Sequence, residues 1–351
     1  MFRLNRRRDH RSPLNTTPPE AQAPSKSQTS LIRRVRMWLY AAALNGGVGG
    51  IMGSVKLLPY GRKLLSRIEV QKNIPYLDDG DQEHTLDVYR PRGVEGPLPV
   101  MLYLHGGGFC YLSKDTHWLL GALFADQGYV VVNANYRLSP RVQFPAALED
   151  AAEALAWIGD NAASIGADTD RLMFAGESAG ANLITSLTVA ACWERPEPVA
   201  KRIWETGLVP QVISPACGML QVTDTQRLAT PDLPQFIVDR LAQVSSNYLP
   251  RGEAPPEGWP LADPVVILEG ADAADRPLPA CFVMCGGRDP LVPDSNRLGA
   301  AWERLGAPVD LKIYEGGHHA FHALLHKPLA KEAWADQFAY IGAHLPPGEP
   351  R

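Results

Sequence analysis

Ser178 is the centre of the pentapeptide Gly-Glu-Ser-Ala-Gly, residues 176–180. The apolar run before it, RLMFAG, is typical of a short buried strand, and residues 179–193 are Ala- and Leu-rich without proline, which is typical of a packed helix. A serine at such a junction lies in a tight turn that presents its hydroxyl at the carboxyl edge of a sheet, as a nucleophile requires. Gly176 and Gly180 would leave room where a Cβ would collide with neighbouring backbone. The pentapeptide alone is a weak signal, and a loop serine without a chemical role is the alternative.

A nucleophilic serine needs three further groups: a base that takes its proton, an acid that orients the base, and N–H donors for the oxyanion. The stretch His105-Gly106-Gly107-Gly108-Phe109 directly follows the apolar run LPVMLYL. Three consecutive glycines let the backbone turn its N–H groups into an open cavity, because no side chain fills the space. We interpret this stretch as an oxyanion-binding loop, with a flexible turn as the alternative.

The acid is predicted at Asp289, which follows the apolar strand candidate PACFVMCGG and so lies at the carboxyl end of a buried strand. Pro290 restrains the residue before it to an extended backbone, which suits a fixed carboxylate. Asp294, five residues further on, is the rival. Its position near the start of a predicted helix favours a role as N-cap.

The base must come from the loop at residues 314–322, which holds His318, His319 and His322. Spacing alone does not choose among these three histidines. A zinc site built from them is the competing chemistry. Adjacent histidines rarely bind one ion together, however, and no carboxylate has the matching spacing.

These groups would be positioned by strands and helices that alternate from about residue 66. Eight strands are predicted, at 69–76, 83–89, 98–104, 129–135, 171–176, 207–214, 279–285 and 309–314. Five helices are predicted between the later strands, at 115–127, 146–161, 179–193, 293–305 and 329–344. Strands of continuous apolar residues that alternate with helices predict an α/β fold with an eight-stranded, mostly parallel sheet flanked by helices.

A proline-rich segment, residues 216–278, interrupts this alternation and holds one predicted helix, 235–246. An insertion between two core strands would form a lid over the carboxyl edge of the sheet. We therefore predict a helical cap from residues 31–65 and 216–278, and an α/β core from residues 66–215 and 279–345.

The N-terminal region is basic. Residues 1–36 carry nine basic and two acidic residues, a net charge of +7, whereas the whole chain carries −4 and the remainder therefore −11. The composition of residues 1–30 predicts disorder. The uncharged run 37–55 approaches a membrane span in length, but five glycines and an asparagine dilute it. We favour a helix that packs over the site, and leave open a peripheral membrane contact through residues 33–55.

Composition narrows the class of protein further. The chain has 351 residues, of which 45% are hydrophobic, enough for one large catalytic domain with a cap. Its pI near 6.1 gives no indication of general nucleic-acid binding. The five cysteines are odd in number and lack C-x-x-C spacing, which favours buried, reduced thiols and a cytoplasmic location.

Five motifs occur in one order: HGGGF, NYRLSP with FPAALEDA, GESAGANL, GGRDPL and YEGGHHAF. Over about residues 70–345 this set resembles the hormone-sensitive-lipase-like carboxylesterases of the α/β-hydrolase fold. The resemblance implies a serine esterase with an N-terminal and inserted-helix cap. It selects His319 as the base and implies the catalytic triad Ser178, Asp289 and His319, with an oxyanion hole formed by the N–H groups of Gly107, Gly108 and Ala179.

Three positions depart from the family pattern: Ala320 stands where glycine is usual, Asn135 where aspartate is common, and Pro293 where an acidic residue is frequent. None of these removes a catalytic group. Four remaining matched residues are interpreted as braces around the site: Tyr136, Arg137, Glu149 and Glu177. For Glu177, a direct catalytic role is the alternative.

The sequence thus predicts a serine carboxylesterase that hydrolyses small short- to medium-chain esters through an acyl-enzyme, with no cofactor, no metal and no nucleic-acid partner. An amidase or deacetylase using the same triad, and a non-catalytic small-molecule receptor, are the alternatives. A homodimer and membrane association through the N-terminal region are left open.

Overall fold

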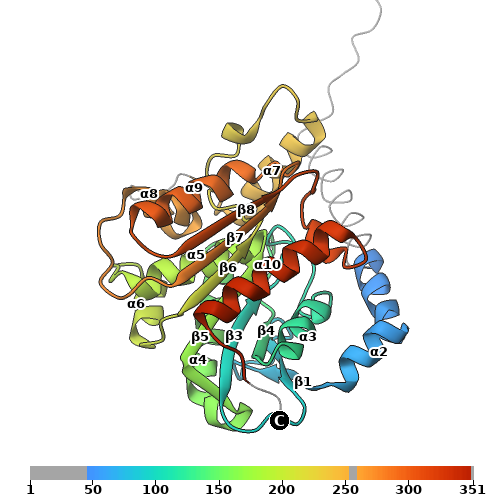
Figure 1. The fold of residues 1–351 in the computed structure, drawn as a ribbon. Coiled ribbons are helices and arrows are strands. Elements are labelled where there is room, and N and C mark those ends of the chain that lie inside the picture. Colours follow the sequence, from blue (N-terminus) through green and yellow to red (C-terminus); the bar gives the residue numbers. More distant parts are fainter. Residues whose placement is uncertain (1–45, 253–258, 349–351) are drawn as a thin grey trace, which may run out of the picture. The chain divides into compact units, whose positions relative to one another are not determined.

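The computed structural model describes residues 46–252 and 259–348. Its centre is an eight-stranded sheet with the strand order β1-β2-β4-β3-β5-β6-β7-β8 (Figure 1). The strands are β1 Ile68–Pro75, β2 Thr85–Pro91, β3 Leu98–Leu104, β4 Val130–Ala134, β5 Ala167–Glu177, β6 Val212–Ala216, β7 Ala280–Gly286 and β8 Val309–Tyr314. All eight predicted strands are present. The predicted strand 207–214 starts later, at Val212, because residues 207–210 form a loop.

The sheet is mostly parallel, as predicted. β1 pairs with β2 and β2 with β4 in antiparallel register, whereas every pair from β4 to β8 is parallel. The carboxyl ends of β3 and β5 to β8 therefore lie along one edge. This edge carries every loop to which the sequence assigns a catalytic group.

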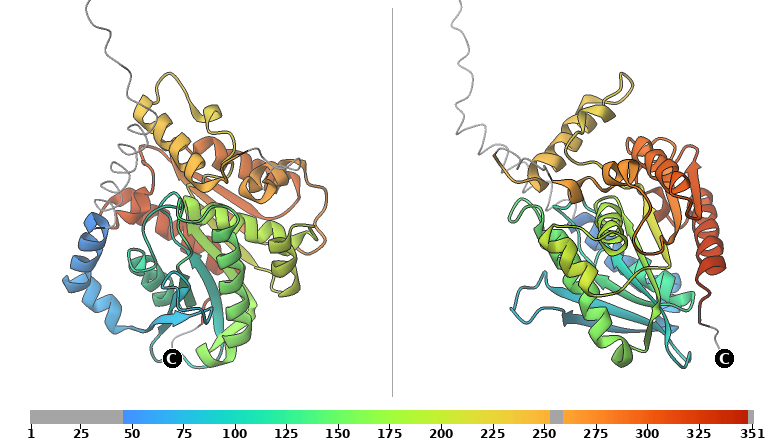
Figure 2. Two further views of the ribbon diagram at one scale, coloured as in Figure 1. Left: turned by 180° about the vertical axis from the view of Figure 1, so that it is seen from behind. Right: turned by 90° about the vertical axis from the view of Figure 1, so that its left-hand side faces the viewer.

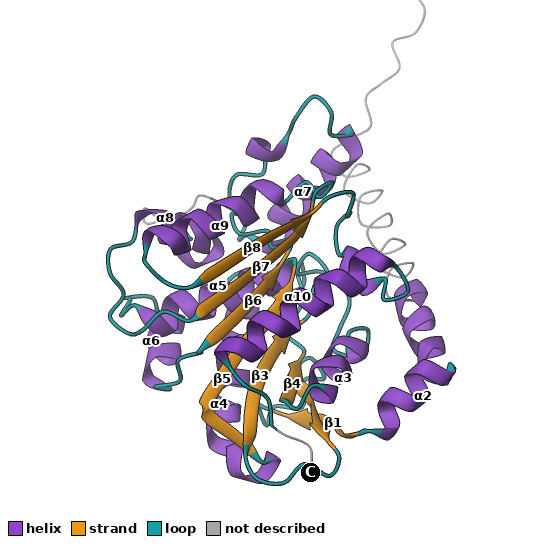
Figure 3. Cartoon of the chain, in the orientation of Figure 1, coloured by secondary structure: helices purple, strands orange, loops and turns teal. Residues whose placement is uncertain are grey.

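Helices cover both faces of the sheet (Figures 2 and 3). They are α2 Pro59–Ser66, α3 Trp118–Asp126, α4 Ala146–Ile165, α5 Ala179–Cys192, α6 Pro198–Glu205, α7 Gln235–Tyr248, α8 Pro264–Gly270, α9 Val292–Arg304 and α10 Pro328–His344. Alternate side chains of β3 point to opposite faces. Val100 and Leu102 join a core with α4 and α5, while Met101 and Tyr103 join a core with α3 and α10. This two-sided burial explains why β3 is continuously apolar.

The helix prediction missed three short helices, α2, α6 and α8, each of which has a proline in its first turn. Proline suits that position because its missing N–H would have no partner within the helix. The expectation of a single helix in residues 216–278 is therefore wrong. That segment contains α7, α8 and two 3₁₀ turns, η1 Gln226–Leu228 and η2 Pro260–Ala262.

The predictions for residues 1–45, including the basic head, lie outside the described residues. Residues 46–57 are helical, and Met52 and Val55 pack against the core that contains Trp118. The indole N–H of Trp118 donates to the carbonyl oxygen of Met52 at 3.0 Å. In the described part of the chain, no helix has both the length and the apolar character that crossing a bilayer requires.

Candidate active site

Ser178 lies in the turn between β5 and α5, as predicted. Its backbone has φ 52° and ψ −112°, a strained combination for a residue with a side chain. Close backbone approach requires the two flanking glycines. A Cβ on Gly176 would lie 2.7 Å from the carbonyl carbon of Gly180, and one on Gly180 would collide with the carbonyl oxygen of Leu104. The two glycines thus let β5 turn sharply into α5, which leaves the serine hydroxyl at the sheet edge.

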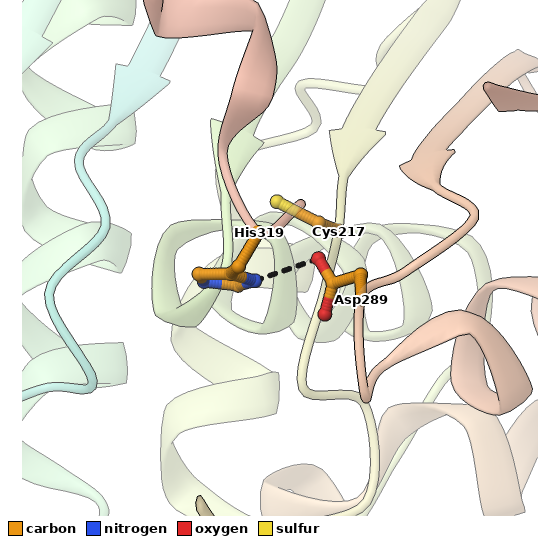
Figure 4. A group of neighbouring side chains, drawn as sticks. All are labelled: Cys217, Asp289 and His319. Carbon is orange, nitrogen blue, oxygen red and sulfur yellow. Dashed lines mark hydrogen bonds and ion pairs between the residues drawn. The ribbon is translucent and has the colours of Figure 1, made fainter. Parts of the chain in front are cut away.

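A line of hydrogen bonds joins Ser178, His319 and Asp289. The Oγ atom of Ser178 lies 3.0 Å from Nε2 of His319, and Nδ1 of His319 lies 2.7 Å from Oδ2 of Asp289. Figure 4 shows the second of these contacts. The residues Ser178, His319 and Asp289 follow β5, β8 and β7. These parallel strands lie in one half of the sheet and bring together side chains up to 141 positions apart.

The three histidines of the β8–α10 loop have different surroundings. His319 reaches Ser178, and its side chain is 41% exposed. His322 is buried, and His318 is exposed. Between His319 and His322, Ala320 has φ 55°, a left-handed conformation that favours glycine. This conformation explains why the family pattern has glycine there.

The environment of His319 tunes its basicity. Partial burial of the ring disfavours the imidazolium, but Cys217 and the carboxylate of Asp289 outweigh this effect and raise the pKa of His319 well above its ordinary value of 6.5. The side chain of Asp289 is buried, and its Oδ1 accepts the backbone N–H of Leu291 at 2.9 Å. The carboxylate is thus held by backbone on one oxygen and by His319 on the other.

Asp294, the rival acid, is engaged elsewhere. Its Oδ2 accepts the backbone N–H of Leu220 at 2.8 Å, and its Oδ1 pairs with the guanidinium of Arg227. Asp294 lies in the first turn of α9, where no side-chain cap is formed, so the N-cap expectation is wrong. Its buried carboxylate instead ties α9 to the segment after β6.

The glycine loop after β3 has backbone angles that favour glycine. Gly107 has φ 120° and Gly108 has φ 58°, and a Cβ on Gly107 would collide with the carbonyl oxygen of Tyr111. Among the described residues, the N–H groups of Gly107, Gly108 and Ala179 donate no backbone hydrogen bond. Unpaired N–H groups at the start of α5 and in a neighbouring glycine loop can stabilise a negative oxygen.

His105, which precedes the glycines, is not a second base. Burial lowers its pKa to about 3, so the ring is neutral. Its Nδ1–H donates to the carbonyl oxygen of Gly106 at 2.7 Å, and its ring stacks on Tyr136 with centroids 4.3 Å apart. The hydroxyl of Tyr136 in turn donates to the carbonyl oxygen of His105 at 2.8 Å. Tyr136 thus braces the loop from below, as predicted.

Arg137 is a brace as well, although its main partner was not predicted. Its guanidinium bonds Asp150 at 2.7 Å and reaches Glu149 only at 3.4 Å. Asp150 is buried and also lies 3.2 Å from Nε2 of His84. Asp150 directly follows Glu149 in the matched motif. A charged residue at an interior position of α4 was the signal that could have predicted this partner of Arg137.

Glu177 belongs to a buried network that sequence reasoning found only in part. Its Oε1 lies 3.0 Å from Nε2 of His117, and its Oε2 lies 3.0 Å from Nε2 of His322. Burial alone would raise the pKa of the carboxyl, but the two histidines lower it well below its ordinary value. His117 had no sequence signal. His322 was considered only as a base or zinc ligand.

Helix α7, from the predicted cap, packs on the glycine loop. Tyr248 stacks on Phe109 with ring centroids 3.6 Å apart. A Cβ on Gly108 would lie 3.0 Å from Cγ2 of Val244. The apolar side chains of α7 therefore border the space above the candidate oxyanion loop.

The chain is similar to known proteins. A family profile described as alpha/beta hydrolase fold matches residues 101–323, which include the glycine loop, Ser178, Asp289 and His319. The chain belongs to the hormone-sensitive-lipase-like carboxylesterases. Among curated proteins, the chain is 29% identical over 250 residues to the carboxylesterase NlhH of Mycobacterium tuberculosis, covering 70% of this chain and 72% of that protein.

A further relative and a solved structure support the α/β-hydrolase fold. The AB hydrolase superfamily protein B1A11.02 of Schizosaccharomyces pombe is 30% identical over 258 residues, covering 70% of this chain and 72% of that protein. The solved structure of a bacterial heroin esterase superposes with a TM-score of 0.71 at 21% identity, covering 87% of this chain and 90% of that one. At that identity the structural likeness supports the α/β-hydrolase fold alone.

Proposed function

We propose that this chain is a serine carboxylesterase that hydrolyses short- to medium-chain carboxylic esters through an acyl-enzyme. The observation that carries the proposal is the unbroken line from Ser178 Oγ through His319 to Asp289. A binding protein would have no need of a base on its serine, which argues against a non-catalytic receptor.

The first half of the reaction acylates the serine. Nε2 of His319 takes the proton of Ser178 as Oγ attacks the ester carbonyl carbon, and the carbonyl electron pair moves onto oxygen. The N–H groups of Gly107, Gly108 and Ala179 donate to that oxyanion. When the tetrahedral intermediate collapses, the carbon–oxygen bond to the alcohol breaks, and the alcohol leaves with the proton from His319.

The second half releases the acid. Water gives a proton to His319 and attacks the acyl carbon, and the intermediate collapses with Ser178 as the leaving group, reprotonated by His319. Asp289 holds the ring so that Nε2 faces the serine, and its charge stabilises the imidazolium formed in both halves. The residues themselves supply each proton transfer, so we propose no cofactor.

We propose that residues 31–65 and 216–278 form the cap that shapes the acyl pocket. The packing of α7 on Phe109 and Gly108 supports this for the second segment. Residues 31–45 and 253–258 lie outside the described residues.

The test is hydrolysis of p-nitrophenyl esters from acetate to palmitate by the full chain and by Ser178→Ala. Short-chain turnover that disappears in Ser178→Ala is expected, since the nucleophile is gone. Ser164→Ala, at an exposed serine near the end of α4, is the matched control and should keep full turnover. Equal turnover by Ser178→Ala and wild type would refute the proposal.

The same triad can act on amides, so the preferred bond needs its own comparison. We expect esters to exceed amides of the same acyl group in kcat/KM. Faster turnover of the matched amide would instead identify an amidase or deacetylase.

We further propose a peripheral contact with anionic lipid that includes residues 33–55. Four large apolar side chains are exposed in the described residues 46–55 and in the five residues that follow: Ile51, Leu57, Leu58 and Tyr60. No acidic residue occurs from residue 21 to 68, whereas eight basic residues do. Exposed apolar side chains with basic residues near them in the sequence suit the surface of an anionic bilayer. A cytoplasmic location and a homodimer stay predictions from the sequence.

Sedimentation with vesicles tests the lipid contact. The full chain should pellet with phosphatidylserine-containing vesicles and less with phosphatidylcholine alone, and the double variant Leu57→Glu/Leu58→Glu should remain in solution. Phe236→Glu, at an exposed apolar residue of α7, is the control and should still pellet. Equal sedimentation of both variants would exclude this face.

A further inference from the structure

Cys217 places its thiol beside the acid and the base of the proposed triad. Three residues each offer one ligand atom here: Cys217, Asp289 and His319. These three atoms all lie within 4.8 Å of one another (Figure 4). The three residues follow β6, β7 and β8, which are consecutive in the sheet. The same edge that gathers the proposed triad therefore also gathers a thiol, an imidazole and a carboxylate.

We propose that Cys217, Asp289 and His319 form a binding site for a thiophilic divalent cation such as Zn²⁺ or Cd²⁺. Thiolate, imidazole and carboxylate are the three donor types that zinc takes from proteins, at about 2.0–2.3 Å each. Ligand atoms that already lie within 4.8 Å of one another need only small side-chain movements to reach one ion. A fourth position remains for water.

The backbone holds the thiol in place. Cys217 has φ 41°, a left-handed conformation, and its N–H donates to the carbonyl oxygen of Met284 at 2.7 Å. The thiol and Asp289 are buried, whereas the side chain of His319 is 41% exposed. An ion can therefore enter from the side of His319 and reach the two buried ligands.

Binding exchanges protons for the ion. The thiol of Cys217 releases its proton to solvent and binds as thiolate, and the imidazole binds through a nitrogen lone pair. The bound His319 can no longer accept the proton of Ser178. The site is therefore inhibitory, and this part of the inference rests on the proposed esterase function, whereas the binding itself does not.

The binding test uses the full chain with Ser178→Ala, which keeps all three ligands. Titration with Cd²⁺ should produce the ultraviolet sulfur-to-cadmium charge-transfer band. Adding Cys217→Ala should remove the band and weaken Cd²⁺ binding by at least roughly 10–100-fold. Removal of a residue that merely supports a metal ligand already has an effect of that size. Cys192→Ala removes another buried thiol, at the end of α5, and should leave the band unchanged.

The activity test uses the chain with its serine intact. Zn²⁺ should inhibit ester hydrolysis, EDTA should restore it, and Cys217→Ala should shift the inhibitory concentration upward by a similar factor. Far-ultraviolet circular dichroism and the Tm of each variant verify folding. A folded Cys217→Ala protein that retains the band, or a parent protein that gives no band, overturns the proposal. If the parent lacks esterase activity, the charge-transfer titration still decides the site.

Discussion

Oε2 of Glu177 lies 3.0 Å from Nε2 of His322. Glu177 directly precedes the candidate nucleophile, and His322 lies three residues after the candidate base. A single buried contact thus connects the two loops whose separation sets the distance from Ser178 to His319. Through its other oxygen, Glu177 also holds His117, at the loop that leads into α3.

Glu177→Gln should lower kcat by roughly 10–100-fold, since a small displacement of His319 from Ser178 is costly. The amide cannot accept from both histidines, so one of them loses its partner. KM should change little, because no proposed substrate contact is removed. Steady-state kinetics on a short-chain ester measure both constants. A variant with wild-type kcat would reduce Glu177 to a purely structural residue.

Glu177 should also stabilise the fold in a pH-dependent manner. Its folded pKa is well below its ordinary value of 4.5, so the stabilisation is present above about pH 4.5 and is lost as the pH falls through the folded pKa. The free energy of unfolding of the wild type should therefore fall more steeply with acid than that of Glu177→Gln. Urea unfolding between pH 3 and pH 7 (about the range that spans the transition) compares the slopes. Parallel curves would contradict the assigned charge of the carboxylate.

Asp289→Asn should reduce kcat/KM by about 10³–10⁴-fold and move its pH dependence. Activity needs neutral His319, and its raised pKa places the acid limb of the wild-type profile above pH 6.5. Loss of the carboxylate charge lowers that pKa, so the limb should shift to lower pH. Profiles of kcat/KM against pH measure the shift.

Asp294→Asn is the matched control for that experiment. Its carboxylate bonds Arg227 and the backbone of Leu220, so the variant should lose stability and keep the acid limb where it is. A shifted limb in Asp294→Asn and not in Asp289→Asn would reverse the assignment of the acid.

Gly107→Ala should lower kcat by about 10²–10³-fold, the loss typical of a missing oxyanion donor. The new methyl group would collide with the carbonyl oxygen of Tyr111 and turn the N–H away from the site. Gly306→Ala is the control, since Gly306 also has positive φ but nothing lies within 4 Å of its added Cβ. Equal losses in both variants would indicate a backbone effect unrelated to the oxyanion.

The sequence was sufficient for the sheet and for the ends of its strands. Apolar runs such as residues 98–104 and 279–285 coincide with β3 and β7 to within one residue, because burial on both faces leaves a local signal in each strand. The helices α6 and α8 have only 8 and 7 residues, which is too short for a helix to be stable alone, so their packing against α5 determines them. The single-helix expectation for the cap failed for this reason.

The candidate site, like the fold, was predicted from the sequence only in part. The motifs alone predicted which residues could carry chemistry, because Ser178, Asp289 and the three histidines each follow a recognisable strand. The residues by themselves did not choose among His318, His319 and His322; that choice came from the family pattern. Only the tertiary structure shows that His319 contacts Ser178 and His322 contacts Glu177. The left-handed turn at Ala320 and the order of the strands determine where each ring points. The approach of Cys217 to His319 is equally a product of strand order, since hydrogen bonding between strands has no local record in the sequence.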